Sequence, residues 1–331
     1  MTTQVTGITS VTAVAILIMT PACAPKPLLE IVRSRRYLLE HPLQWTSRHL
    51  EAVGCRFDDI GTPACLESTH QDREDTERGQ SSDAEALARS LFPNVKLRCL
   101  FNILLGEGRG FACVRKGSHF CFQGRAVHQP DYIVFRRHEP PSNNILPPTV
   151  GYIHYTNING DRRELFERRS RATRAVDPIG EYGRFLLVTP QEWTDDPYFL
   201  CILLALGQSQ HRHDSSQTTA YITHLLVTHV LDRDSILLCE AEITTDLLNA
   251  LKNLKTARTP VKWPSIRRKK IPYKPYNTFA DRLLGELVTS GPSNAADHAN
   301  YACSNKTKRR HEEEDGEDDS GSRKVPRILG T

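Results

Sequence analysis

Apolar positions along the chain gather in short blocks, and their spacing changes from helical to strand-like between blocks. Residues 95–105 and 198–206 are apolar on nearly every face, which predicts two buried helices. Blocks rich in β-branched and aromatic residues predict strands, at 111–116, 119–122, 127–135, 150–155, 221–230 and 235–242. This order of elements predicts one α/β core domain over residues 81–290, with a mixed sheet flanked by helices.

The segments around these blocks carry weaker patterns. Residues 28–49 have apolar positions at helical spacing and predict a helix within an N-terminal helical segment, 28–66. Residues 71–82 hold almost no apolar side chain, so a polar linker is expected over 67–80. Ser82 and Glu85 fit a capping box that starts a short helix.

Three further segments are interpreted from local signals alone. Residues 185–189 read as a short strand, and 279–288 as a final helix. Residues 271–275 read as an extended edge segment, because their two prolines cannot sit inside a sheet. A flexible N-terminus, 1–27, and a disordered charged tail, 291–331, complete the division of the chain.

Composition changes this picture little. Apolar residues are 39% of the 331-residue chain, and the net charge of +4 arises from 43 basic and 39 acidic residues, so charge alone selects no partner. The nine cysteines include no CxxC pair, which excludes the usual zinc and redox signatures. Cys201 and Cys239 lie in apolar runs, as small hydrophobic side chains of a protein in a reducing compartment do.

A Pro-Asp pair at Pro130 and Asp131 enters one predicted strand, and the next strand ends near His154. This layout resembles the restriction-endonuclease-like, or PD-(D/E)XK, superfamily. The resemblance implies that Asp131 matches the family's aspartate, while its acid and lysine positions fall on His154 and Thr156. A Mg²⁺ site needs several oxygen ligands, so these three positions are interpreted as vestigial. Either the match is accidental or the chain is a catalytically inactive member.

Residues 198–206 and 271–275 also resemble a family of uncharacterised proteins from filamentous fungi. Some proteins of that kind are encoded in secondary-metabolite clusters, so the resemblance implies such a setting as one alternative. It assigns no activity, cofactor or metal.

Two other constellations were weighed against simpler interpretations. Residues 267–270 are basic and precede Tyr273 and Tyr276, which suits a nucleic-acid backbone, but a solvated edge strand explains them better. The four residues that could surround a zinc ion are Cys113, His119, Cys121 and His128. No pair of them has the standard spacing of zinc ligands, so roles in the core or at the surface are favoured.

The two ends of the chain bear on location. Residues 11–19 are mostly apolar and precede an Ala-Cys-Ala sequence like a signal-peptidase site, but no Lys or Arg comes before them. Secretion is therefore the alternative to a nuclear or cytoplasmic location. A basic cluster in the tail suits a nuclear import receptor, and it consists of Lys306, Lys308, Arg309 and Arg310.

These patterns favour a non-catalytic intracellular protein on a degenerate nuclease-like scaffold, which binds a protein or nucleic acid. One alternative is an accessory protein or unrecognised enzyme of a fungal biosynthetic pathway. Another is an active Mg²⁺-dependent nuclease. No membrane partner and no cofactor are predicted.

Overall fold

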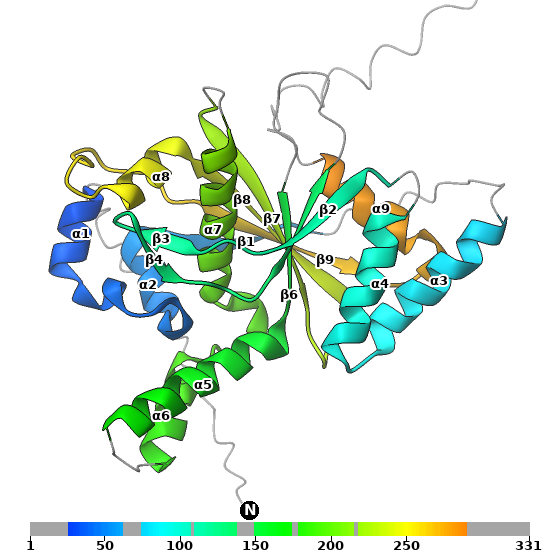
Figure 1. The fold of residues 1–331 in the computed structure, drawn as a ribbon, viewed down its shortest axis with the longest axis horizontal. Helices are drawn as coiled ribbons and strands as arrows, with labels where there is room; N and C mark the ends of the chain where they lie inside the picture. The colour runs from blue at the N-terminus through cyan, green and yellow to red at the C-terminus, as the bar shows by residue number, and fades with distance from the viewer. Residues whose placement is uncertain are drawn as a thin grey trace, which may run out of the picture. The chain divides into compact units, whose positions relative to one another are not determined.

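The computed structural model describes residues 26–61, 74–106, 109–137, 149–173, 178–214 and 218–289. Their core is a mixed seven-stranded sheet with the strand order β1-β9-β8-β7-β6-β5-β2 (Figure 1). The strands are β1 (Arg56–Asp59), β2 (Phe111–Lys116), β5 (Ile133–Arg137), β6 (Thr149–His154), β7 (Ala220–Thr228), β8 (Ser235–Thr244) and β9 (Ser265–Pro272). A separate two-stranded ribbon pairs β3 (Phe120–Phe122) with β4 (Arg125–His128).

Strand direction divides the sheet. The strands β2, β5 and β6 follow one another as antiparallel neighbours, and β6 then lies parallel to β7. The helix α7 (Tyr198–His213) precedes β7 in the chain, after the long excursion that a parallel connection requires. The strands β8 and β9 continue the sheet as antiparallel neighbours, and β1 is parallel to β9. The predicted mixed α/β architecture is confirmed.

Helices cover both faces of this sheet (Figure 1). One face carries α3 (Glu74–Arg89), α4 (Pro93–Leu105) and α9 (Tyr276–Thr289). The other carries α7, α8 (Thr245–Lys252) and an N-terminal layer made of α1 (Leu28–Ser34), η1 (Arg36–Leu39), η2 (Pro42–Gln44) and α2 (Ser47–Val53). Neighbouring residues of a strand face opposite sides, so Tyr152 and Ile153 enter different hydrophobic clusters.

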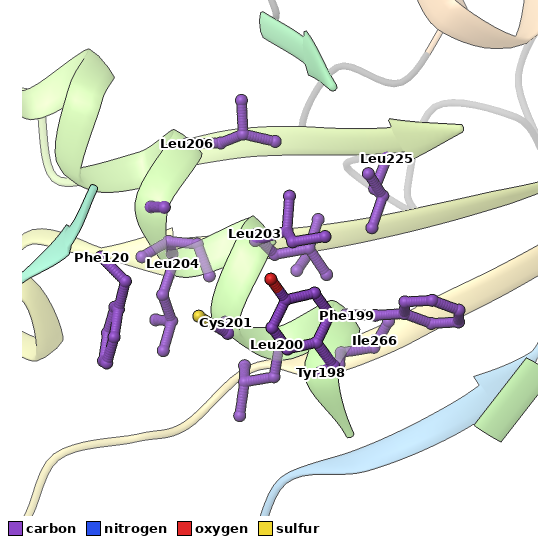
Figure 2. Close-up of a cluster of buried hydrophobic side chains, with 14 of the residues drawn as sticks. Phe120, Tyr198, Phe199, Leu200, Cys201, Leu203, Leu204, Leu206, Leu225 and Ile266 are labelled. Carbon is purple, nitrogen blue, oxygen red and sulfur yellow. The ribbon is translucent and has the colours of Figure 1, made fainter. Parts of the chain in front are cut away.

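The helix α7 forms the centre of one cluster, as its all-round apolar sequence predicts (Figure 2). Its residues from Tyr198 to Leu206 are all buried. Asp196 accepts a hydrogen bond from the Tyr198 amide and thereby satisfies one of the free N–H groups at the helix start. A helix buried on every side has no polar face to orient it, so the sheet and the N-terminal layer must enclose it together.

The N-terminal segment belongs to this core, although the sequence places the domain boundary at residue 81. Leu28, Leu43 and Leu50 are buried in the same cluster as α7. The strand β1 extends the sheet by pairing with β9, with Phe57 opposite Ile266. Local periodicity shows that residues 28–49 have an apolar side, but it does not show what covers that side. The core therefore begins at Leu28.

Several element predictions are corrected by the same kind of tertiary contact. The helix predicted for 28–49 is divided into four short pieces, and Pro42 begins η2. The polar stretch predicted as a linker is helical from Glu74, because α3 packs against α4 and α9. The Ser82–Glu85 capping box therefore lies inside α3 rather than at its start. Residues 62–73 lie outside the described part of the chain.

One strand assignment also changes, and the extent of another is now defined. The segment predicted as a strand at 185–189 lies mostly in the helix α6 (Pro178–Val188), which packs against α5 (Tyr155–Thr173). The segment predicted as an extended edge at 271–275 begins in the last two residues of β9, where Ile271 and Pro272 pair with β8. The pairing of β9 with β1 covers Ser265 to Arg268 and does not reach them. Pro272 ends the strand and lies opposite Ser235. Only the earlier part of β9 therefore lies inside the sheet.

None of the helices in the described ranges is long and apolar enough to span a membrane. The short 3-10 helix η3 (Trp193–Asp195) links α6 to α7 and completes the described elements.

Candidate functional site

The three positions implied by the nuclease resemblance lie at one end of the β5–β6 pair. Asp131 precedes β5, His154 is the last residue of β6, and Thr156 is in the first turn of α5. Ile133 pairs with Tyr152 in the antiparallel register, so Asp131 and His154 each lie two residues further toward the same end. The layout expected from the sequence is present, but their side chains enter different surroundings.

Asp131 is exposed, with 59% of its side-chain surface accessible, and its carboxylate lies 3.5 Å from the ammonium group of Lys116. A second carboxylate comes from α5, where the pKa of Asp161 is raised to about 6, first by burial and then by the charges of Asp131 and Glu164. Arg168 and Lys116 act in the opposite direction. The sequence gives no local signal for Asp161, because only the turn from β6 into α5 brings it near Asp131.

His154 is buried where the family would place a carboxylate. Its Nδ1 accepts a hydrogen bond from the Thr156 amide at 3.3 Å, so the proton of the neutral ring is on Nε2. The pKa of His154 is lowered to about 4, first by burial and then by the charges of Lys96 and His229. Nε2 is buried and has no hydrogen-bond partner among the described residues. A neutral imidazole cannot supply the negative charge of a metal-binding acid. Thr156 itself is exposed and carries no charge at the lysine position.

Lys96 is a buried cation whose charge acts on His154, and no pattern in the sequence marks it. Its ammonium group donates to the carbonyl oxygens of Leu87 and Ala88, at 2.5 and 3.5 Å, in the last turn of α3. It also lies 5.9 Å from the ring centre of Tyr273. Burial lowers the pKa of Lys96 to about 8. A cation on the free carbonyls at a helix end is stabilising, so Lys96 holds α3 against α4.

Other polar side chains near His154 belong to the packed core. The hydroxyl groups of Tyr152 and Thr228 are 2.9 Å apart. The ring of His229 stacks on Trp193 with their centres 5.0 Å apart. Within the described residues, no three His, Cys, Asp or Glu side chains are arranged to hold a metal ion. Asp131, His154 and Thr156 therefore share one end of the sheet without forming a common site.

The basic stretch of β9 is compensated within the protein. Arg267 pairs with Glu240, and Arg268 pairs with both Asp59 and Asp195. Lys269 lies 2.6 Å from Glu286, and Lys270 lies 3.8 Å from Asp232. Every cation of the stretch thus has an acidic partner in the fold. The interpretation as a structural strand, rather than a nucleic-acid surface, agrees with these contacts, although the strand is internal.

Two of the four residues considered as a zinc site have contacts of their own. His128 lies 2.6 Å from the Tyr198 hydroxyl, and burial together with His41 and His119 lowers its pKa to about 4. The backbone N–H of Cys121 donates to the Gln208 side chain at 2.9 Å. Cys201 and Cys239 are buried free thiols whose pKa values are raised by burial, as expected of small hydrophobic side chains.

A buried ion pair organises the end of the molecule near α5. The guanidinium group of Arg162 makes two hydrogen bonds to the Asp196 carboxylate, at 2.6 and 2.7 Å, and neither side chain is exposed. Tyr155 donates to the same carboxylate at 2.9 Å. Arg162 also donates to the Leu43 carbonyl at 3.0 Å. This network joins α5, the start of α7 and the N-terminal layer, so its role is structural.

The helix α6 presents an exposed apolar surface, here called the α6 ridge. It consists of Tyr182, Leu186 and Leu187, which are 64%, 52% and 79% exposed. Arg184 is exposed beside it, and the guanidinium group of Arg163 lies 5.4 Å from the ring centre of Phe185. The helices α5 and α6 pack on each other and extend away from the sheet (Figure 1). Contiguous exposed apolar side chains of this kind mark interaction sites.

Comparison with known proteins adds no assignment. No family model matches the chain, and no curated protein or solved structure gives a significant match. The import-signal positions, Lys306, Lys308, Arg309 and Arg310, lie outside the described residues.

Proposed function

We propose that this chain is a non-catalytic intracellular binding protein on a degenerate nuclease-like scaffold, and that its partner is a protein that binds the α6 ridge. The exposed surface of Tyr182, Leu186 and Leu187 is the single observation that carries the choice of partner.

Strand order supports the nuclease-like scaffold. The chain passes from α4 through the antiparallel strands β2, β5 and β6, then through α7 into β7, which is parallel to β6. Asp131 and His154 lie at the same end of neighbouring strands, as the aspartate and the acid of that family do. The resemblance in sequence rests on only a few residues. The order and direction of the strands support it independently.

The chemistry of the three positions supports the non-catalytic part of the proposal. A hard divalent cation is bound through oxygen ligands, usually carboxylates and waters. The acid position holds a neutral imidazole, and the charge of buried Lys96 acts on it. Asp131 is already paired with Lys116. An active Mg²⁺ nuclease and an accessory role in a fungal pathway remain alternatives, but no contact described above favours either.

The choice of a protein over a nucleic acid rests on charge. Binding to a phosphate backbone requires cations that can replace its counterions. The four cations of β9 have intramolecular acidic partners. The cost of breaking those ion pairs would offset the free energy gained by binding phosphate groups. The α6 ridge instead suits the mode in which an amphipathic helix enters an apolar groove. Arg163 and Arg184 beside the ridge favour acidic residues at the rim of that groove.

Replacing Leu186→Glu together with Leu187→Glu tests this proposal. In proximity labelling in cells, the double variant should no longer label the main partner of the unmodified chain. Binding would bury two carboxylates in the apolar groove of the partner, which is unfavourable. Leu231→Glu, at an equally exposed leucine away from the ridge, is the matched control and should keep that partner. The purified partner should then bind the double variant with an affinity at least tenfold lower than its affinity for the unmodified chain. Equal labelling and equal affinity for both variants would remove the ridge from the proposal.

The non-catalytic part has its own measurement. Purified full-length chain is incubated with supercoiled plasmid and with labelled single-stranded DNA and RNA, in Mg²⁺ and in Mn²⁺. No cleavage above a buffer control is expected. Cleavage that disappears in the Asp131→Ala variant would establish the active-nuclease alternative. Salt-sensitive binding of the labelled strands, reduced in an Arg267→Ala variant, would establish a nucleic-acid partner.

A further inference from the structure

Three elements far from the α6 ridge in sequence, the β3–β4 ribbon, α7 and α8, pack against one another (Figure 1). A pocket of about 210 Å³ lies between them. A single water needs roughly 10–15 Å³, so this pocket can hold a molecule of several heavy atoms. The side chains that line it are mostly polar or charged, and they are Cys121, Gln208, His211, Arg212, Leu248 and Lys252.

Hydrogen bonds join the walls of this pocket to one another. The Gln208 side chain in α7 accepts from the Cys121 amide at 2.9 Å and donates to the Cys121 carbonyl at 2.8 Å, which ties α7 to β3. In the turn between β3 and β4, the Gln123 amide donates to the Leu251 carbonyl of α8 at 2.8 Å. The ribbon is therefore bound to both helices. A site that is formed in advance loses less free energy when it orders a ligand.

Two cations at the pocket lack an acidic partner within the described part of the chain. Arg212, in the last turn of α7, donates to the Cys121 sulfur at 4.0 Å. Lys252 is the last residue of α8, and no carboxylate of the described residues forms an ion pair with either cation. The free carbonyls at each helix end carry about half a negative charge. Two full positive charges exceed that sum, so the pocket, unlike β9, has an uncompensated positive charge.

The carboxylate that follows α7 orients a third side chain of the pocket. Asp214 accepts a hydrogen bond from the Tyr221 hydroxyl at 2.9 Å, and that hydroxyl lies 3.1 Å from Nδ1 of His211. Because Tyr221 donates its proton to Asp214, Nδ1 of His211 is the donor in the second pair. This chain of hydrogen bonds fixes the ring of His211 at the pocket wall.

We propose that this pocket binds the anionic group of a small organic molecule, a phosphate or a carboxylate, through Arg212 and Lys252. Guanidinium and ammonium groups form short, charge-assisted hydrogen bonds with both kinds of anion. The buried side chain of Leu248 supplies an apolar part of the lining, which suits the carbon atoms next to the anion. The volume of the pocket favours such a molecule over a lone inorganic ion.

The free thiol of Cys121 lines the pocket and can report its charge. Purified full-length chain is treated with a dianionic disulfide, dithiobis-nitrobenzoate, or with a dicationic one, cystamine. Modification of the Cys121 peptide is followed over time by mass spectrometry. The ratio of the anionic to the cationic rate should fall at least about fivefold in Arg212→Gln with Lys252→Gln, because the positive charge that concentrates anions there is lost.

A matched control removes the same charge elsewhere. Arg33→Gln with Arg36→Gln changes two exposed cations of the N-terminal layer that do not line the pocket. Its ratio of rates should stay within about twofold of that of the unmodified chain, because salt screens distant charges. Circular dichroism should show that both double variants are folded, since all four side chains are exposed. An equal fall of the ratio in the two double variants would overturn the proposal.

Protection of Cys121 from uncharged iodoacetamide identifies the anion. Inorganic phosphate and glutarate are added separately at millimolar concentration, with the ionic strength held constant by sodium chloride. Alkylation slowed at least about threefold by phosphate alone assigns a phosphate ester, by glutarate alone a carboxylate, and by both a site that accepts either. The effect should be absent in Arg212→Gln with Lys252→Gln.

Slowing by neither anion, or equal slowing in that double variant, would overturn the proposal whatever the ratio of rates. The α6 ridge takes no part in these measurements, so their failure leaves the proposed function untouched.

Discussion

Arg162 and Asp196 lie without exposed surface at the point where α5, α7 and the N-terminal layer meet. Each charge has lost its water and depends on the other for stabilisation. The helix α5 also carries an exposed ion pair, between Arg168 and Glu164. Arg162 and Arg168 belong to the same helix and differ chiefly in burial. Comparing them therefore shows how burial changes the contribution of an ion pair to stability.

Replacing Arg162→Met should lower the free energy of unfolding by about 3–5 kcal/mol, because Asp196 would remain buried without its partner. Urea denaturation followed by circular dichroism measures the change. Arg168→Met is the control, and its effect should stay below about 0.5 kcal/mol, since exposed pairs are screened by water. Equal losses in the two variants would contradict the structural role of the buried pair.

Histidine burial predicts a dependence of stability on pH. Burial holds the pKa values of His154, His128 and His224 at about 4 in the folded protein, below the value near 6.5 expected when unfolded. Between these values the unfolded chain binds more protons, so the free energy of unfolding falls as pH drops from about 6.5 to 4. Each histidine contributes a slope of about 1.4 kcal/mol per pH unit at most.

The variant His154→Asn checks this assignment, because its side-chain oxygen can still accept from the Thr156 amide. Urea unfolding from pH 4.5 to 7.5 should show a slope smaller by about one proton than that of the unmodified chain. Leu231→Asn changes an exposed side chain that has no titratable group and should leave the slope unchanged. An unaltered slope in His154→Asn would mean that His154 is not the group that titrates.

At the scale of elements, the close packing of α7 on the sheet depends on a glycine, Gly207. A Cβ atom on Gly207 would lie 3.1 Å from both Cβ and Cγ2 of Ile243 in β8. Those atoms are near the backbone of a central strand and have little freedom to move. An alanine at this position would therefore require α7 or Ile243 to move by a few tenths of an ångström.

Gly207→Ala should consequently lower the free energy of unfolding by about 1–2 kcal/mol, even though alanine favours helix formation. Gly160→Ala in α5 meets no atom within 4 Å and should instead raise it by up to about 1 kcal/mol. Thermal and urea unfolding of both variants measure the difference. A gain in stability from Gly207→Ala would show that α7 and β8 can separate without cost.

At the scale of the whole molecule, the chain has two parts, the described residues up to Thr289 and the segment after Gly291. The first bears on the fold, and the second bears on location. The first is a folded core whose polar contacts are largely internal. The second is a stretch of blocks of like charge, whose basic cluster is the basis for proposing nuclear import. The choice between a nuclear and a cytoplasmic location stays a prediction from sequence.

A fluorescent fusion of the chain tests that prediction. Changing Lys306, Lys308, Arg309 and Arg310 together to alanine should reduce the nuclear-to-cytoplasmic ratio severalfold, because an import receptor binds clustered cations. Arg323→Ala with Lys324→Ala removes charge further along the tail and is the control. An unchanged ratio in the first variant would end the import proposal.

Elements whose burial is complete were predictable from the chain alone. The helix over 198–206 and the strands β6, β7 and β8 are apolar through most of their length, so their kind follows from local composition and period. The position of Asp131 at a strand entry was predictable for the same reason. In these segments, propensity and tertiary environment favour the same structure.

Tertiary contacts decided the remainder. The polar residues after Glu74 are helical because α4 and α9 cover one side of α3, and residues 178–188 are helical because α5 does so for α6. Asp161 comes near Asp131, and Lys96 near His154, through turns that no spacing in the chain reveals. Local sequence specifies which side of a segment is apolar. Only packing, which joins residues far apart in the chain, specifies what covers that side and which charges lose their water.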